Sequence, residues 1–271
     1  MTSLPPPDFR TSLPFKTLRV QRAGAVLSVE LNLPDQGNAV TDTMLDELQA
    51  VLDDQDPEVR VLVLSGAGED FCQGGDRTEY AEHLHHDPGG AGIRASGVRA
   101  RRVCEALTGN PAVTVARIHG KVIGAGLALA LACDLRVGAD TATFRLPELA
   151  LGLPTAWGGL LPRLLNEVGA ARVRELILTG RAFGAEEALY LSILQRVVPA
   201  ADLDAAVSEW ARPVVRRSPA ALRVTKTLLN SCSAATRLAD VSLFDPELMA
   251  AVAAEGYRRR RVDGVVSLPV R

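Results

Sequence analysis

Hydrophobic and polar residues alternate along the first part of the chain. Apolar side chains occupy every second position on both sides of residues 22–24, which predicts two antiparallel strands within Leu18–Leu31. A helical pattern follows, with Thr41 or Asp42 as its cap. The apolar face of that helix comprises Met44, Leu45, Leu48, Val51 and Leu52. The next run, Val59–Leu64, has no polar face, so strand, helix and strand predict a mostly parallel sheet with a right-handed crossover.

Two glycine-rich turns each follow a predicted strand. Gly120, Gly124 and Gly126 come after the apolar strand Val113–Ile118 and lead into an apolar helix, and residues 71–76 precede a second helix in the same way. The carboxyl ends of neighbouring parallel strands are where open α/β sheets place ligands, and the first amides of a helix lack intrahelical acceptors. We therefore expect the turns to form one site for a negatively charged oxygen. The alternative is that they only allow close packing.

A polar segment with three histidines lies between the two turns. His83, His85 and His86 precede the glycine-rich residues 87–92, and this segment is interpreted as a mobile surface loop near the entrance of the site. The histidine spacing, without an acidic partner on a defined element, does not favour a metal site, so no metal is expected. A helix is predicted over Val98–Leu107.

The second half of the chain changes from mixed to helical. Short strands are predicted at 135–137 and 143–144, and Pro147 then fixes the backbone directly before the carboxylate of Glu148. Five helices are predicted after Gly169: Ala170–Leu178, Ala185–Leu194, Ala201–Val215, Pro219–Leu229 and Leu248–Tyr257. The expected organisation is a flexible leader at 1–15, a core bearing the site at 16–199 and a helical region at 200–271.

Composition narrows the possible functions. A net charge of −2 gives no general basic surplus for nucleic acid, and Arg258–Arg261 is interpreted as a solvated helix end. The four cysteines are widely spaced, which indicates neither a disulfide framework nor a zinc site. This cysteine pattern fits a protein of the reducing cytoplasm. The longest apolar run, Leu127–Cys133, is well short of the roughly 18 residues that a membrane span requires. We expect a cytoplasmic protein that binds neither nucleic acid nor membrane.

Several motifs in order resemble the crotonase, or enoyl-CoA hydratase/isomerase, superfamily over about residues 16–230. The motifs are Leu31–Pro34 with Gly37–Val40, Phe71–Asp76, His119–Gly126 with Cys133–Asp134, Leu146–Gly152, Leu178–Arg181 with Ala185–Ala188, and Val197–Pro199. The resemblance implies an α/β fold, a crotonase-like spiral of β-β-α units whose C-terminal helices assemble homotrimers or hexamers. It also implies a substrate that is an acyl-CoA or carrier-bound acyl thioester, with coenzyme A as part of the substrate and no separate cofactor.

Carried over by position, the resemblance assigns site residues. The amides of Gly75 and Ala125 are expected to hold the thioester oxygen, and Glu148 is expected to be the base, in a desolvated pocket that raises its pKa. The alternative role for Glu148 is to cap local amides or to form an ion pair with Arg145 or Arg163. Further substrate contacts are expected from Asn38 and Ala39 along the nucleotide of coenzyme A, from Gly74, Asp76 and Gly124, and from Trp157 at the acyl group.

One departure from the family pattern bears on the reaction. Hydratases of the family use a second glutamate, and here that position holds Ala128, whose methyl group cannot act as an acid or base. Isomerisation of a 3-enoyl to a 2-enoyl thioester needs only one carboxylate, so it is favoured over hydration. The alternatives are a dehydratase acting in polyketide or secondary metabolism and a non-catalytic acyl-CoA-binding protein.

Three more side chains and a lysine have two interpretations each. Asp76, Glu79 and Tyr80 follow the first amide donor. They could supply a second proton relay; alternatively, Asp76 caps a helix and the other two are solvated helix residues. Lys226 meets a coenzyme phosphate or is simply an exposed lysine.

Overall fold

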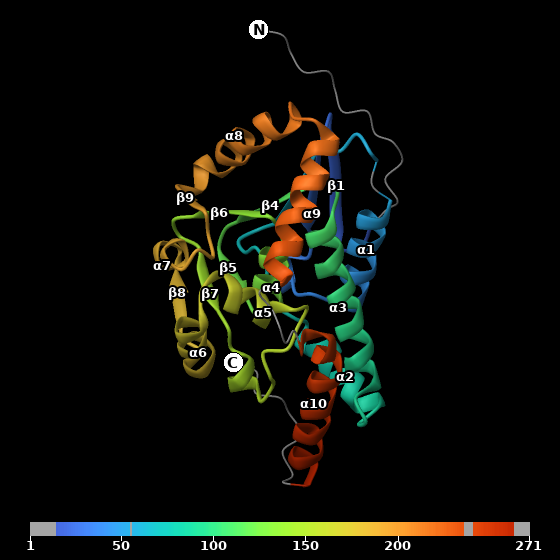
Figure 1. The fold of residues 1–271 in the computed structure, drawn as a ribbon. Helices are drawn as coiled ribbons and strands as arrows, with labels where there is room; N and C mark the ends of the chain where they lie inside the picture. The colour runs from blue at the N-terminus through green and yellow to red at the C-terminus, as the bar shows by residue number, and fades with distance from the viewer. Residues whose placement is uncertain (1–14, 55, 236–240, 263–271) are drawn as a thin grey trace.

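The computed structural model describes residues 15–54, 56–235 and 241–262, and its centre is a six-stranded sheet (Figure 1). The strand order is β1-β2-β3-β4-β6-β9, in which only β1 and β2 pair in antiparallel fashion. The strands are β1 (Leu18–Ala23), β2 (Val26–Leu31), β3 (Val61–Gly66), β4 (Val113–Ile118), β6 (Leu135–Ala139) and β9 (Arg196–Val198). The predicted hairpin and mostly parallel sheet are confirmed.

A second, three-stranded sheet lies beside the first. It contains β5 (Lys121–Ile123), β7 (Thr143–Arg145) and β8 (Ala182–Gly184), with β7 in the middle. Phe144 and Phe183 stack between neighbouring strands with ring centroids 5.3 Å apart. Neither β5 nor β8 was predicted, because β5 lies within the second glycine-rich turn and β8 lies between two predicted helices.

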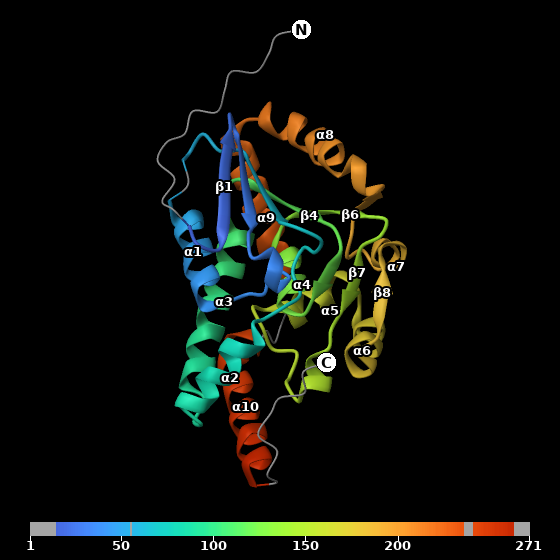
Figure 2. The same cartoon turned by 180° about the vertical axis from the view of Figure 1, so that it is seen from behind.

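Helices surround the sheets (Figures 1 and 2). They are α1 (Asp42–Asp53), α2 (Arg77–His86), α3 (Ala91–Gly109), α4 (Ala125–Ala132), α5 (Leu160–Glu167), α6 (Ala170–Thr179), α7 (Ala185–Tyr190), α8 (Leu203–Val215), α9 (Pro219–Ala235) and α10 (Asp245–Val262). Helix α8 packs on β3, β4 and β6, and α10 runs beside α2 and α3 at the far end of the molecule. Short 3-10 turns include η2 (Glu148–Leu151).

The first two helices begin where capping chemistry predicts. Thr41 accepts a hydrogen bond from the Met44 amide, and the five apolar residues predicted for α1 are all buried. Asp76 caps α2 by accepting hydrogen bonds from the amides of Thr78 and Glu79 at 2.8 and 2.9 Å. Capping by a short oxygen-bearing side chain fixes both starts.

The loop predicted around the three histidines is wrong. His83, His85 and His86 form the last turn of α2, and α3 begins at Ala91, seven residues before the predicted Val98. The Asp87 carboxylate accepts hydrogen bonds from the amides of Gly89 and Ala91, each at 2.8 Å, so it organises a tight turn between the helices. The glycines of this segment serve the turn and the packing of α3, where a mobile surface loop was expected.

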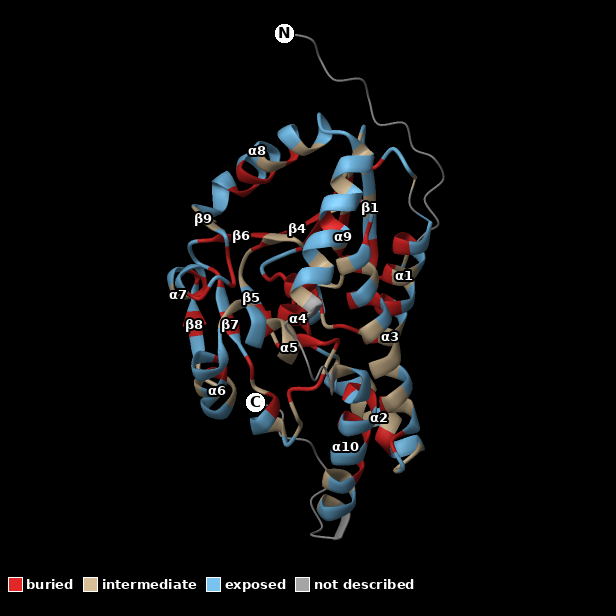
Figure 3. Cartoon of the chain, viewed as in Figure 1, coloured by how far each residue is buried: buried red, intermediate tan, exposed pale blue. Residues whose placement is uncertain are grey.

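The buried residues (Figure 3) form a large core and two smaller apolar clusters, one of which lies between α2, α3 and α10. Every residue of α4 is buried at the centre of the large core, whereas a separate apolar cluster fills the space between the sheet and α8. Within the described ranges, no helix combines the length and apolar character needed to cross a membrane. The expected leader lies outside the described residues except for Phe15, and the division at residue 199 stays a prediction.

Candidate active site

The two glycine turns meet, as their positions predict. Cys72 pairs with Val122 in a parallel bridge, and the Ile123 amide donates a 2.9 Å hydrogen bond to the Cys72 carbonyl. Gly74 has a φ of 100°, and a Cβ atom there would lie 3.1 Å from the Ile123 oxygen and 3.9 Å from the Ala125 nitrogen. This close approach of two backbones is why glycine is needed.

Two backbone amides at this meeting point lack acceptors. Gly75 is exposed, and Ala125 is the first residue of α4, where no intrahelical acceptor exists. Neither amide donates to another group in the part of the chain that the structure describes. Gly124, with φ 50° and ψ −110°, directs the chain into α4 and presents the Ala125 amide at the turn. The helix start also contributes a partial positive charge.

Glu148 lies against the second turn. A Cβ atom on Gly124 would be 2.8 Å from Glu148 Oε1, so the carboxylate occupies the space that glycine leaves open. The residue is only 9% exposed, and Oε2 has no hydrogen-bond partner among the described residues. Burial raises the pKa of this carboxyl to about 7, and its own backbone amide opposes the shift. A carboxyl half ionised near neutral pH suits proton transfer.

The alternative ion pairs of Glu148 are absent among the described contacts. Arg145 Nε donates to the Gly180 carbonyl at 2.8 Å, and Arg163 Nη1 donates to Thr108 Oγ1 at 2.5 Å. Both guanidinium groups are therefore engaged elsewhere, and Glu148 faces the cavity without a counter-charge from either.

A cavity of about 310 Å³ joins these groups. It brings together seven residues that the sequence assigned to the site: Gly74, Gly75, Asp76, Gly124, Ala125, Glu148 and Trp157. Glu79 and Tyr80, which the sequence places after the first amide donor, also line it, and side chains of α3 and α10 that the motifs did not indicate complete the wall. The cavity thus places a buried carboxyl and two free amides on one side and an apolar chamber beyond them.

The side chain of Asn38 makes hydrogen bonds within the protein. It is fully buried, and its side chain donates to the carbonyls of Ala67 and Asp70 at 2.8 Å and accepts from the Leu33 amide at 2.9 Å. Its amide group is therefore fully used in holding the turn, with φ at 53°. The expected place of the Asn38–Ala39 segment along the nucleotide of coenzyme A stays a prediction; neither residue lines the cavity, and Ala39 is partly exposed.

No second carboxylate comes from the first turn of α4. Ala128 is fully buried within α4 and does not line the cavity. Asp76 serves as the cap of α2, and Glu79 Oε2 accepts a 2.8 Å hydrogen bond from the Asp42 amide at the start of α1. The Tyr80 hydroxyl is enclosed, and burial raises its pKa well above the usual range. Asp76 and one oxygen of Glu79 thus have structural contacts, whereas the Tyr80 hydroxyl has no hydrogen-bond partner among the described residues and is not solvated; a proton relay stays a prediction.

Lys226 fits neither of its two interpretations. It is 9% exposed, and its Nζ lies 2.7 Å from Asp134 Oδ2 and 3.0 Å from the Ala112 carbonyl. The lysine ties α9 to the main sheet and is not available to a coenzyme phosphate.

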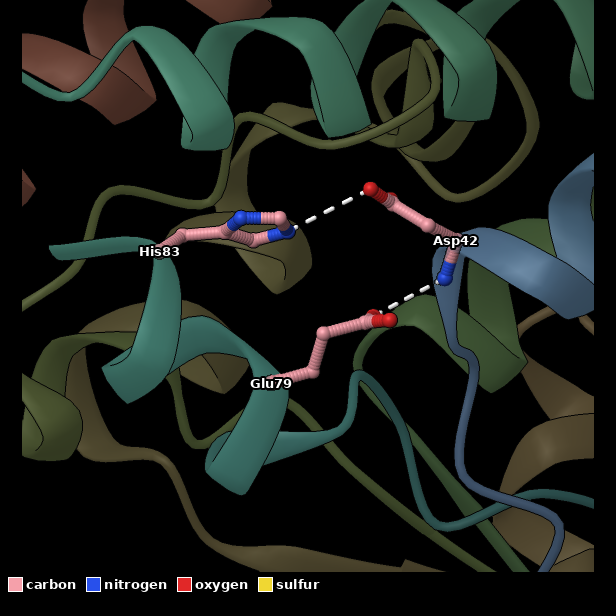
Figure 4. A group of neighbouring side chains, drawn as sticks. All are labelled: Asp42, Glu79 and His83. Atoms are coloured by element: carbon pink, nitrogen blue, oxygen red, sulfur yellow. Dashed lines mark hydrogen bonds and ion pairs between the residues drawn. The ribbon is translucent and has the colours of Figure 1, made fainter. Parts of the chain in front are cut away.

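A cluster that the sequence did not reveal lies on the cavity wall (Figure 4). His83 Nε2 is 3.3 Å from Asp42 Oδ2, and one oxygen or nitrogen from each of Asp42, Glu79 and His83 lies within 4.8 Å of the others. The histidine was expected to have no acidic partner, yet it has two. The signal was hidden because Asp42 is far away in sequence and Glu79 faces His83 only once α2 is recognised as a helix.

Comparison with known proteins assigns the family. The family model for enoyl-CoA hydratase/isomerase matches residues 21–264. The chain therefore belongs to the enoyl-CoA hydratase/isomerase family, the crotonase superfamily, whose members act on acyl-CoA thioesters.

Individual relatives agree with this family. The carnitinyl-CoA dehydratase of Escherichia coli is 35% identical over 80% of this chain and 82% of its own length. The short-chain-enoyl-CoA hydratase of Clostridium acetobutylicum is 30% identical over 81% of this chain and 84% of its own length. An enoyl-CoA hydratase structure from Thermobifida fusca in complex with CoA has a TM-score of 0.75 and 30% identity, covering 93% of this chain and 95% of that one. The fold is thus that of crotonase enzymes.

Proposed function

We propose that this enzyme isomerises 3-enoyl-CoA thioesters to the conjugated 2-enoyl products, with Glu148 as its base. The main support is the buried carboxyl of Glu148, which lies next to the turn that presents the Ala125 amide and has one oxygen without a hydrogen-bond partner among the described residues. The alanine at position 128 leaves the α4 position without a second acid or base.

The reaction balances with one carboxylate. The Glu148 carboxylate takes a proton from C2, and the electron pair of that C–H bond moves into a dienolate whose negative charge rests on the thioester oxygen. The amides of Gly75 and Ala125 donate to that oxygen; one such preorganised donor contributes on the order of 3 kcal/mol to transition-state stabilisation. Protonated Glu148 then returns the proton to C4, which leaves the double bond between C2 and C3 and restores the carboxylate.

The remaining expectations belong to the same proposal. The Thermobifida fusca complex supports coenzyme A as the carrier of the acyl group, while a carrier-protein thioester stays an alternative. Exposed apolar residues on α9, namely Val224, Leu228 and Leu229, support assembly into a homotrimer or hexamer. A cytoplasmic location and the absence of a separate cofactor stay predictions.

A second candidate is hydration of a 2-enoyl-CoA or the reverse dehydration. It is favoured by the names of the relatives, which are a hydratase and a dehydratase. This reaction requires a second group to activate or release water, and it also uses the amides and Glu148.

The deciding experiment compares substrates and variants. Purified wild type and Glu148→Gln are given 3-hexenoyl-CoA or 2-hexenoyl-CoA, and products are separated by chromatography. We expect wild type to convert the 3-enoyl substrate, and Glu148→Gln to lose about 10²- to 10⁴-fold in kcat. The exposed Glu186→Gln is the matched control and should retain wild-type activity.

The other outcomes separate the alternatives. Faster formation of 3-hydroxyhexanoyl-CoA from the 2-enoyl substrate supports hydration and contradicts the isomerase proposal. Equal turnover by wild type and Glu148→Gln contradicts the assigned base. Tight acyl-CoA binding without turnover indicates a binding protein.

A further inference from the structure

The wall of the cavity opposite to the family motifs is mixed in character. Ile93, Leu153, Trp157 and Met249 give it an apolar surface from α3, the loop after η2, and α10. His83 and Glu79 interrupt that surface with an imidazole and a carboxylate from α2. A plain hydrocarbon chain would remove both polar groups from water without replacing their hydrogen bonds, which costs free energy.

His83 and Glu79 both contact Asp42 at the start of α1. Asp42 Oδ2 lies 3.3 Å from His83 Nε2, and the Asp42 amide donates to Glu79 Oε2. Gly92 on α3 leaves room for the ring, since a Cβ atom there would be 2.6 Å from His83 Nδ1. The His83 side chain is 28% exposed. Nε2 is the ring nitrogen on the side of Asp42 and Glu79, and it has no hydrogen-bond partner among the described residues, so it is the nitrogen left for a ligand.

The position along α2 argues for recognition rather than proton transfer. The helix rises about 1.5 Å per residue, so His83 begins roughly 9 Å beyond Arg77 along the axis. Arg77 directly follows the Gly75–Asp76 turn, where the thioester oxygen is expected. The reacting carbons C2 to C4 remain within three bonds of the carbonyl carbon. His83 therefore meets a part of the acyl group beyond the carbons that react.

The surrounding charges favour an uncharged ligand group over a metal ion. Arg99 Nη1 lies 3.4 Å from the same Asp42 oxygen that faces His83, and Glu79 Oε2 already accepts an amide. A cation would meet the Arg99 guanidinium, whereas a carboxylate would meet Asp42 and Glu79. A hydroxyl group suits the wall, because it accepts a hydrogen bond from an imidazole N–H and donates one to a carboxylate.

We propose that the natural acyl group carries a hydroxyl group several carbons beyond the thioester, bound by His83 and Glu79. This inference rests on the acyl-thioester site proposed above. Glu148 supports occupation of the same cavity by a ligand, because its side chain is nine-tenths buried and one oxygen lacks a partner in the described chain. Asp42 is a positioning residue, and the apolar wall packs against the intervening methylene groups.

Equilibrium binding of saturated acyl-CoA ligands tests the inference without any reaction. Hexanoyl-CoA, 6-hydroxyhexanoyl-CoA and adipoyl-CoA are titrated calorimetrically into wild type, His83→Leu and the control His85→Leu, which alters an exposed histidine on the same helix. We expect wild type and the control to bind the hydroxylated ligand at least 10-fold more tightly than hexanoyl-CoA. In His83→Leu the ratio should fall to near 1, with the affinity for hexanoyl-CoA retained.

A second variant keeps the inference testable if His83→Leu does not fold. Glu79→Gln keeps an oxygen for the Asp42 amide, and it should reduce the hydroxyl preference several-fold. Equal wild-type affinities for hexanoyl- and hydroxyhexanoyl-CoA overturn the inference, as does a preference that survives in His83→Leu. Tighter binding of adipoyl-CoA than of 6-hydroxyhexanoyl-CoA would indicate a carboxylate on the natural acyl group and would also overturn the inference. A hydroxyl preference that is lost when zinc is removed and restored when zinc is added would overturn it too.

The result is separable from the proposed reaction. If wild type shows the hydroxyl preference but does not isomerise 3-hexenoyl-CoA or its 6-hydroxy analogue, only the isomerase proposal fails. If isomerisation proceeds and the binding preference is missing, only the present inference fails.

Discussion

The two sides of the cavity are built in different ways. On one side, two glycine turns and the Pro147–Glu148 segment present backbone amides and one buried carboxyl, all within short sequence motifs. On the other side, α2, α3 and α10 lie side by side (Figure 1) and contribute side chains that are far apart in the sequence. In our proposals, the first side carries out the reaction, and the second distinguishes one acyl group from another.

Burial of Glu148 on the motif side makes the stability of the folded protein depend on pH, with lower stability above about pH 7 than in acid. Because burial raises the pKa of Glu148 from 4.5 to about 7, the folded protein binds this proton more tightly than the unfolded chain does. The resulting stabilisation is complete below pH 4.5 and is lost as the pH rises through about 7, a difference on the order of 3 kcal/mol.

The largest effect is expected from a methyl group placed in the second turn. In Gly124→Ala the new Cβ would lie 2.8 Å from Glu148 Oε1 at a φ of 50°, so both the carboxylate and the Ala125 amide must shift. We expect kcat for 3-hexenoyl-CoA to fall at least ~100-fold, since small displacements at a reacting centre have effects of that order. Steady-state kinetics measure this.

The control uses a glycine at a similar backbone angle elsewhere. Gly152 has a φ of 71° and open space around its Cβ position, so Gly152→Ala carries the backbone strain without the collision. Equal losses of activity in the two variants would contradict a specific role for the contact between Gly124 and Glu148.

The next effect is a pH dependence that belongs to Glu148 alone. The base must be ionised, and its pKa of about 7 predicts that kcat/KM falls about tenfold per pH unit below neutrality and levels off above it. An unperturbed carboxyl would place the midpoint near 4.5. Rates with 3-hexenoyl-CoA between pH 5 and 9 check this, and a midpoint near the unperturbed value would mean that Glu148 is solvated or is not the base.

The two sides differ in how far sequence alone predicts them. The hairpin, the face of α1, both glycine turns and Glu148 follow from local periodicity, capping and motif spacing, and the structure brings most of the assigned residues to one cavity. The helical wall was missed because its contacts join residues far apart, such as Asp42 with His83 and Gly97 with Pro246 on α10. Glycine-rich composition around residues 87–92 also suggested a loop, although Asp87 organises a tight turn there.

The smallest effect is expected from a methyl group on the helical wall. In Gly92→Ala the new Cβ would lie 2.6 Å from His83 Nδ1, so the ring must turn away from its place beside Asp42. Activity with unsubstituted 3-hexenoyl-CoA should change less than about twofold, because His83 lies beyond the reacting carbons, whereas the preference for 6-hydroxyhexanoyl-CoA should weaken several-fold. Gly109→Ala, on the same helix with open space at its Cβ position, should change neither quantity. A loss of basic turnover in Gly92→Ala comparable to that of Gly124→Ala would remove the distinction between the two sides, because the wall would then take part in the reaction itself.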